Sequence, residues 1–401
     1  MGSSLLINLL IKKLKYLLTF RLNSSPIVLL YDRLLLWLIL CLSCIGLIMV
    51  TSSSMFVGIK YFNDSLYFLK REILYYFLSG LLSVCVLYFP IYIWQRFSFF
   101  LLLITLIILL LIPIFGYSIN GASRWIIYGY FHIQPSELLK LTFFCYFANY
   151  LDKMKGVFIN ILDICEPVII IFIFFLLLLM QPDFGAVIIF ILTILSVLFI
   201  SGILWWKFLF LVSFIILLVV LLIFEQPYRI YRIISFWNPW LDPFGGGYQL
   251  IQSLVAFGRG EFFGQGLGNS IQKFEYLPEA YSDFIFSIIA EELGFLGVLL
   301  ILFMMILVIF RGMLISYKAF KMRQLFFAYL SSAINFCFSF QVLINIGTVT
   351  GMLPTKGSTL PLISYGGSSF LVAFLSIVFL LRIDFELRVI DDQAFIKGFV
   401  E

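Results

Sequence analysis

The chain has 401 residues, of which 63% are hydrophobic and only 12% are charged. A soluble globular domain carries roughly 45–50% apolar and about 25% charged residues. The composition therefore excludes an ordinary soluble enzyme, a disordered protein and a disulfide-stapled secreted module. The net charge of +5, from 26 Lys and Arg against 21 Asp and Glu, is too small and too scattered for nucleic-acid binding, so no nucleic-acid partner is expected.

Apolar runs predict ten membrane-spanning helices, because a spanning helix needs about 20 mostly apolar residues. In chain order the runs cover residues 34–53, 72–92, 97–116, 135–151, 164–182, 184–203, 205–225, 283–310, 324–350 and 360–382. Residues 226–282 are polar, Gly-rich and aromatic, and loops of this size are usually functional. The sequence therefore predicts an all-α polytopic membrane protein with one large extracytoplasmic loop between helices seven and eight.

The distribution of Lys and Arg predicts that both termini face the cytoplasm. In this orientation the cytoplasmic segments hold 16 of these residues and the opposite side holds nine, four of them in the long loop, which the positive-inside rule discounts. The expected organisation is a cytoplasmic tail over 1–33, a membrane domain over 34–382 and a cytoplasmic tail over 383–401. The N-terminal tail lacks a cleavage-site pattern and is either an amphipathic helix on the inner leaflet or a frayed basic tail.

Cysteine and histidine provide little chemistry in this sequence. Cys41 and Cys44 have C-x-x-C spacing, but no second pair or histidine cluster accompanies them, so packing between helices is favoured over a metal or redox site. His132 is the only histidine, which excludes a site built from several histidines.

Charged residues gather where the apolar runs reach the predicted outer surface, and charges in apolar surroundings mark function by default. Arg124 lies in the loop between the third and fourth runs. Glu137 and Lys140 open the fourth run and share a helix face, so they form either a structural ion pair or part of a site. Asp183, in the next outer hairpin, is either a helix cap or a site residue.

The end of the long loop carries a further carboxylate, Asp283, at the start of the eighth run. It is either a helix cap or a general base that faces a water-accessible cleft, and the spacing alone favours the cap. At the outer end of the tenth run, Lys356 precedes a stretch of hydroxyls and glycines that includes Ser368. Small residues there allow close helix packing, which is the alternative to a binding role.

These motifs together resemble the SEDS family (shape, elongation, division and sporulation) of membrane glycosyltransferases that polymerise peptidoglycan. The resemblance covers Tyr31 to Phe395, and it is closest to the division branch of the family. It is carried by GASRWI at 121–126, QPSELLKL at 134–141, QPDFG at 181–185, LPEAYSDFIF at 277–286, AEELG at 290–294 and LPLISYGGSS at 360–369. One departure is Tyr281-Ser282, where many members have His-Thr.

The resemblance implies that the sugar hydroxyl of one lipid II molecule attacks the anomeric carbon of another, with inversion and release of polyprenyl pyrophosphate. Asp283 matches the essential loop aspartate of the family and becomes the expected catalytic base. Such a reaction needs positively charged groups beside the pyrophosphate as it leaves. The residues expected to bind substrate or pyrophosphate are Arg124, Glu137, Lys140, Lys356, Glu279 and Ser368. The family also implies a divalent cation, Mg or Mn, for which no dense ligand cluster is readable.

Two other functions stay open at this point, a lipid II flippase and a division scaffold. A transporter usually shows repeated halves and polar residues near the bilayer midplane, and neither is apparent. A scaffold leaves the embedded charges unexplained. The implied partners are a class B penicillin-binding protein (a transpeptidase) and other membrane proteins of the division complex, with spans eight and nine, including 335–345, as the expected contact face. The implied location is the septal cytoplasmic (inner) membrane of a bacterium.

Overall fold

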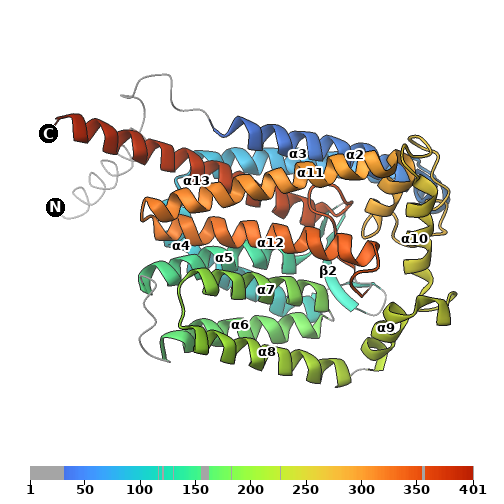
Figure 1. Ribbon diagram of the computed structural model, residues 1–401, viewed down its shortest axis with the longest axis horizontal. Coiled ribbons are helices and arrows are strands. Elements are labelled where there is room, and N and C mark those ends of the chain that lie inside the picture. The colour runs from blue at the N-terminus through green and yellow to red at the C-terminus, as the bar shows by residue number, and fades with distance from the viewer. Residues whose placement is uncertain are drawn as a thin grey trace.

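The computed structural model describes residues 31–115, 117–119, 122–129, 131–154, 162–181, 183–225, 227–354 and 357–400. Long helices dominate these residues and lie side by side along the length of the molecule (Figure 1). They are α2 (Arg33–Phe62), α3 (Tyr67–Tyr88), α4 (Ile91–Phe115), α5 (Pro135–Met154), α6 (Leu162–Met180), α7 (Phe184–Ile200), α8 (Trp205–Glu225), α11 (Ile285–Lys321), α12 (Leu325–Val349) and α13 (Gly367–Val400). The all-α membrane fold expected from the sequence is confirmed. The expectations for residues 1–30 and for Lys356 lie outside the described residues.

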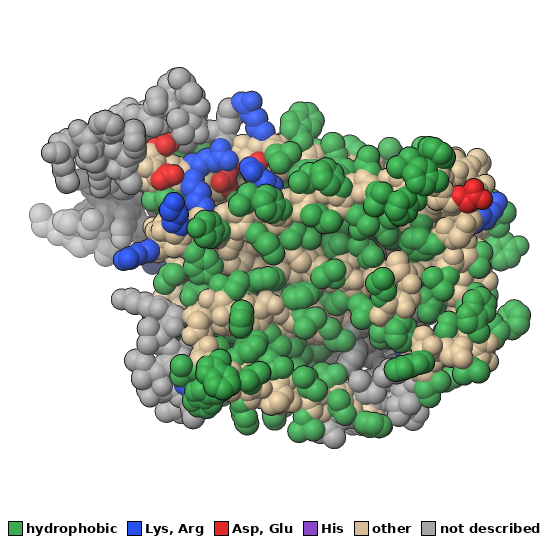
Figure 2. All heavy atoms as spheres, in the orientation of Figure 1, with side chains coloured by type: hydrophobic (Ala, Val, Ile, Leu, Met, Phe, Trp, Pro, Cys, Tyr) green, Lys and Arg blue, Asp and Glu red, His purple; other side chains and the backbone are tan. Residues whose placement is uncertain are grey.

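Five of the described helices are long and apolar enough to cross a membrane, namely α2, α3, α4, α11 and α12. Shorter apolar stretches occupy α6, α7 and α8. Apolar side chains cover the middle of the face shown in Figure 2, and Lys, Arg, Asp and Glu gather mainly toward the end where the C-terminus lies. This is the distribution expected of a helical bundle whose sides face lipid.

Shorter elements lie at the other end of the bundle, where α9, α10 and β2 are seen (Figure 1). A small antiparallel sheet in the order β1-β2-β3 links α4 to α5 and consists of β1 (Tyr117–Ile119), β2 (Ala122–Tyr128) and β3 (Phe131–Ile133). The loop between α8 and α11 contains α9 (Pro227–Trp237), the short 3₁₀ helix η1 (Pro239–Leu241) and α10 (Tyr248–Gly260). The end that carries these elements is the one that positions the candidate site.

The centre of the bundle is α12, which packs against α5, α7 and α11. Its polar side chains Asn335 and Asn345 are buried inside the chain, with 3% and 0% of their surface exposed. The expectation that residues 335–345 offer a contact face to a partner protein is therefore wrong for these two side chains. The amides face neighbouring helices because an unpaired amide facing lipid would be costly.

The segment expected to be a C-terminal tail continues α13 as far as Val400. Two ion pairs at i,i+4 spacing support this helix, Arg382 with Glu386 (2.8 Å) and Arg388 with Asp384 (2.6 Å). Arg382 also donates to the backbone carbonyl of Leu87 at the end of α3. The charged start of the expected tail is thus anchored to the bundle.

Candidate active site

Asp283 lies two residues before α11, in a turn that closes the long loop. The residue at the cap position of α11 is Phe284, and no side chain caps that helix. The helix-cap alternative for Asp283 is therefore wrong. The carboxylate is half-buried and lies directly against Gly357, where an added Cβ would come within 2.5 Å of Oδ2 of Asp283. The side chain is thus held at the surface of the site without a structural hydrogen bond to the helix that follows it.

The surroundings of Asp283 favour its protonated form. Burial, together with the negative charges of Glu279 and Asp183, raises the pKa of the Asp283 carboxyl from 3.8 to about 7. The positive charge of Arg124 opposes this rise. A carboxylate whose pKa lies close to neutrality is suited to accept a proton in a reaction at neutral pH.

Asp183 joins the beginning of α5 to the beginning of α7. Its Oδ1 accepts a hydrogen bond from the backbone N–H of Ala186 (3.3 Å), so the cap alternative for this residue is confirmed. Its Oδ2 accepts from the Nε2 amide of Gln134 (3.1 Å) and from the hydroxyl of Ser136 (3.4 Å). The two Gln-Pro motifs of the sequence therefore meet at one buried carboxylate.

Two further motifs connect to the same place. Arg124, on β2, donates from Nε to the backbone carbonyl of Gln181 (2.8 Å) in the turn between α6 and α7. Ser368, in the first turn of α13, is buried and its hydroxyl accepts from the backbone N–H of Gln134 (3.1 Å). Segments that are distant in the sequence are thus joined around the starts of α5, α7 and α13.

The remaining predicted site residues have different surroundings. Lys140 and Glu137 form a buried ion pair with an Nζ–Oε1 distance of 2.7 Å, as their shared helix face predicts. Glu279 is exposed, has a positive φ of 56° and accepts a hydrogen bond from the hydroxyl of Ser282 (2.8 Å). The structure thus brings Glu279, Asp183 and Arg124 within electrostatic reach of Asp283, whereas Lys140 is engaged by its own partner.

An aromatic cluster beside the site was not predicted from the sequence. The hydroxyl of Tyr75, on α3, accepts from the backbone N–H of His132 (2.7 Å) and donates to its carbonyl (3.1 Å), which fixes β3 to α3. The backbone N–H of Tyr365 donates to the carbonyl of Tyr281 (3.0 Å), and the two rings pack edge to face. Aromatic residues are so common in this chain that composition could not single these out.

Two glutamates of the AEELG motif hold the long loop against α11. Both are fully buried, and Glu291 accepts from Arg259 Nη1 (2.8 Å), from the Ser270 hydroxyl and from the backbone N–H of Ile271 (3.0 Å). Glu292 accepts from the Ser52 hydroxyl (2.7 Å) and from Lys273 Nζ (3.1 Å). Both carboxylates therefore anchor the long loop, Glu291 through Ser270 and Ile271 and Glu292 through Lys273.

The helix that carries these glutamates is interrupted at Gly294, which has φ 66° and ψ −167°. The loop fills the break, because the N–H groups of Gln265 and Gly266 donate to the carbonyls of Glu291 and Glu292, and that of Phe295 donates to Glu261. A Cβ on Gly294 would lie 2.2 Å from the nitrogen of Gly264, so only glycine fits. Residues 285–293 thus form a short rigid helix between Asp283 and the break.

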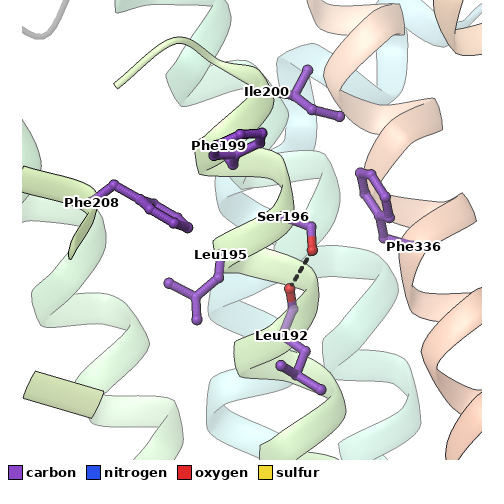
Figure 3. Close-up of a pocket in the computed structure, with 7 residues that line it drawn as sticks. All are labelled: Leu192, Leu195, Ser196, Phe199, Ile200, Phe208 and Phe336. Atoms are coloured by element: carbon purple, nitrogen blue, oxygen red, sulfur yellow. Dashed lines mark hydrogen bonds between the residues drawn. The ribbon is translucent and has the colours of Figure 1, made fainter. Parts of the chain in front are cut away.

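An apolar hollow of about 260 Å³ lies away from these groups, between α7, α8 and α12 (Figure 3). It is lined by Phe199, Phe208, Phe336 and neighbouring aliphatic side chains. Ser196 is the polar residue in its lining, and the hydroxyl of Ser196 donates to the backbone carbonyl of Leu192 (2.8 Å), as Figure 3 shows. This hollow can accommodate an apolar chain but has no group for acid–base chemistry.

Comparison with known proteins identifies the family. A family model described as cell cycle protein, for FtsW, RodA and SpoVE, matches residues 32–389. A protein of Buchnera aphidicola (Acyrthosiphon pisum) named probable peptidoglycan glycosyltransferase FtsW is 51% identical over 92% of this chain and 93% of its own length. One of the same name from Escherichia coli O157:H7 is 49% identical, over 94% of this chain and 91% of its own length.

Solved structures agree with the fold. A chain from a peptidoglycan synthase complex that coordinates polymerization and crosslinking is 26% identical, with a TM-score of 0.73 over 90% of this chain and 99% of that chain. The rod shape determining protein RodA of Thermus thermophilus is 24% identical, with a TM-score of 0.66 over 90% of this chain and 98% of its own. The second likeness concerns the fold alone.

Proposed function

This chain belongs to the FtsW/RodA/SpoVE family of cell cycle proteins, the SEDS family, and we propose that Asp283 is the general base of its reaction. The chain is a peptidoglycan glycosyltransferase that acts in cell-wall synthesis. The observation that carries the proposal for Asp283 is its half-buried carboxylate with a pKa of about 7, within electrostatic reach of Arg124 and without a capping role.

The proposed reaction joins two lipid II molecules. Asp283 accepts the proton of the acceptor hydroxyl as this oxygen attacks the anomeric carbon of the donor. The bond from that carbon to the pyrophosphate oxygen breaks, polyprenyl pyrophosphate leaves, and the configuration inverts. A base close to neutrality can both take up this proton and release it to water afterwards.

The second requirement is a set of positively charged side chains next to the pyrophosphate leaving group. Arg124, Lys140 and Lys356 are the cations proposed for the pyrophosphate, with Ser368 as a hydroxyl donor and Glu137 as the group that orients Lys140. Arg124 is the best supported of these, because it already acts on the electrostatics of Asp283. Its planar guanidinium is suited to bidentate contacts with phosphate oxygens.

A divalent cation would fit this site only together with the substrate. Within the described ranges, no group of three or more His, Cys, Asp or Glu residues could form a dedicated cage. Mg²⁺ is commonly held by one or two carboxylates, water and substrate phosphates. Glu279, which is exposed, is the carboxylate proposed to share an Mg²⁺ or Mn²⁺ with the pyrophosphate, where the ion would neutralise negative charge.

The proposed setting is a division septum in the cytoplasmic membrane of a bacterium, with ten spans and both termini in the cytoplasm. A class B penicillin-binding protein is the proposed partner, and it would crosslink the strands made here. The likeness to a chain from a peptidoglycan synthase complex supports this partnership. A flippase is less well supported, because repeated halves, which are usual in transporters, are not apparent in the sequence. A scaffold is less well supported because it needs no carboxylate tuned close to neutrality.

The test is reconstitution with purified components. The protein in detergent or liposomes would be given fluorescent lipid II, with and without a class B penicillin-binding protein, and glycan strands would be resolved on gels. The proposal predicts strands and one released polyprenyl pyrophosphate for each linkage formed. Movement of lipid II across liposomes without any polymer would contradict it and support a flippase.

A further inference from the structure

Asn345 connects the two chain segments that border the candidate site. It lies near the end of α12, and its side chain is completely buried. Its Nδ2 donates two hydrogen bonds, one to the backbone carbonyl of Asp283 (2.9 Å) and one to the backbone carbonyl of Ser358 (2.5 Å). A single amide group therefore bridges the turn before α11 and the segment that leads toward α13.

This bridge fixes a tight contact at the carboxylate itself. The segment that contains Ser358 begins with Gly357, and a Cβ there would lie 2.5 Å from Oδ2 of Asp283. Lys356, the proposed pyrophosphate cation, immediately precedes Gly357 in the sequence. A shift of this segment relative to Asp283 would therefore change the contact at the proposed base.

The amide is retained in spite of a cost. Among the described residues, Asn345 Oδ1 is one of the few buried side-chain polar atoms that lack a hydrogen-bond partner. A buried carbonyl without a partner destabilises the fold. The two hydrogen bonds from Nδ2 compensate for this cost. They satisfy two backbone carbonyls that lie outside the helices and have no partner in a helical hydrogen-bond pattern.

We infer that Asn345 is a positioning residue, which holds the backbone of Asp283 and the Gly357–Ser358 segment in one fixed relation for catalysis. This inference rests on the proposed role of Asp283 as the base. A base acts only within hydrogen-bond reach of the proton that it abstracts. The alternative is that Asn345 merely satisfies two carbonyls and contributes to folding.

The test is Asn345→Asp, which keeps the shape of the side chain and replaces an amide with two donors by a carboxyl group that donates at most one hydrogen bond. The matched control is Asn335→Asp, which puts the same charge at an equally buried asparagine on the same helix. For Asn345→Asp we expect kcat to fall roughly 10²-fold beyond the control, the scale of a 1 Å misplacement, with KM almost unchanged. Because the two variants can differ in stability, their rates are compared per folded protein.

Two outcomes would overturn the inference. One is equal activity of Asn345→Asp and Asn335→Asp per folded protein. If Asn345→Asp does not fold, Asn345→Ala takes its place, because it removes both donors without adding an ionisable group. The other outcome is a kcat within twofold of wild type for Asn345→Ala.

The double variant Asp283→Asn, Asn345→Asp separates this inference from the proposed function. If both hold, the double variant is no slower than Asp283→Asn alone, because the base to be positioned is already absent. A wild-type rate in Asp283→Asn alone would reject the base. A large loss in Asp283→Asn together with no loss in Asn345→Asp would reject only the positioning role.

Discussion

Arg124 donates a hydrogen bond from Nε to the backbone carbonyl of Gln181, 2.8 Å away. This bond ties β2 to the turn between α6 and α7, immediately before the helix that Asp183 caps. An arginine can make such a bond with Nε and still direct its terminal nitrogens elsewhere, which a lysine cannot. The residue thus has both a structural contact and the geometry of a phosphate ligand.

Substitution of Arg124 by lysine tests this double role. Arg124→Lys keeps the charge but loses the fork of donors, so we expect kcat/KM for lipid II polymerisation to fall roughly 10-fold or more. Arg323→Lys is the control. It is the same change in the turn between α11 and α12, and this turn lies at the end of α11 that is remote from Asp283. Equal rates for the two variants would argue against a role for Arg124 with the substrate.

The pKa of Asp283 predicts how the rate depends on pH. The base must be ionised, so kcat/KM should rise with pH through a midpoint close to the pKa of about 7. The charge of Glu279 contributes to the raised pKa, so Glu279→Gln should move this midpoint to lower pH. Rate profiles of wild type and variant on the same substrate provide the measurement, and an unmoved midpoint would contradict the electrostatic account.

The same shift predicts how folding stability depends on pH. Because the folded-state pKa of Asp283 lies above its ordinary value of 3.8, this group favours the folded state at acid pH, and that contribution is lost as pH rises toward about 7. Asp283→Asn removes the ionisation. The variant should therefore unfold at a higher temperature than wild type at pH 8, and the gap should narrow at pH 5. A constant gap at both pH values would speak against the shifted pKa.

Glu291→Gln tests the anchor of the long loop. The carboxylate is fully buried and accepts a charge-assisted bond from Arg259, so its loss should cost about 1.5–3 kcal/mol of stability. Lys70→Ala, which breaks the exposed pair with Asp64, should leave the unfolding temperature nearly unchanged. Thermal unfolding in detergent compares the two, and similar small effects would show that the buried pair adds little.

The sequence predicts the long helices well because each needs only a run of apolar residues. It does not predict the sheet β1–β3, whose strands are short. Helices α9 and α10 are amphipathic, but a search for apolar runs of about 20 residues passes over helices of 11 and 13 residues. It also places the end of the last span at 382, although the i,i+4 pairs formed by Arg382 and Arg388 are themselves a helix signal.

The site is predictable only in part for a similar reason. Asp283 and Arg124 come from motifs far apart in the chain, and the family resemblance, not their spacing, brings them together. The effect of Asp183 on Asp283 follows only from the structure. The loop contacts of Glu291 and Glu292 depend on the break at Gly294, and periodicity alone cannot reveal a break. The role of Asn345 depends on two backbone carbonyls, which leave no trace in residue identity.

The proposed orientation is tested with cysteines at exposed positions. In a variant without native cysteines, Leu267→Cys in the long loop and Gln393→Cys near the end of α13 would be treated with a membrane-impermeant thiol reagent on intact cells. The count of Lys and Arg predicts labelling of Leu267→Cys alone. Labelling of Gln393→Cys alone would place the candidate site on the wrong side of the membrane.

The most direct measurement of the central claim is the rate of glycan polymerisation by purified Asp283→Asn. Asparagine keeps the shape of the side chain and removes the proton acceptor, so the rate should fall roughly 10²–10⁴-fold, the usual contribution of a general base. Asp64→Asn, the same change at a half-buried carboxylate paired with Lys70, should keep the wild-type rate. A near wild-type rate for folded Asp283→Asn would contradict the assignment of Asp283 as the base.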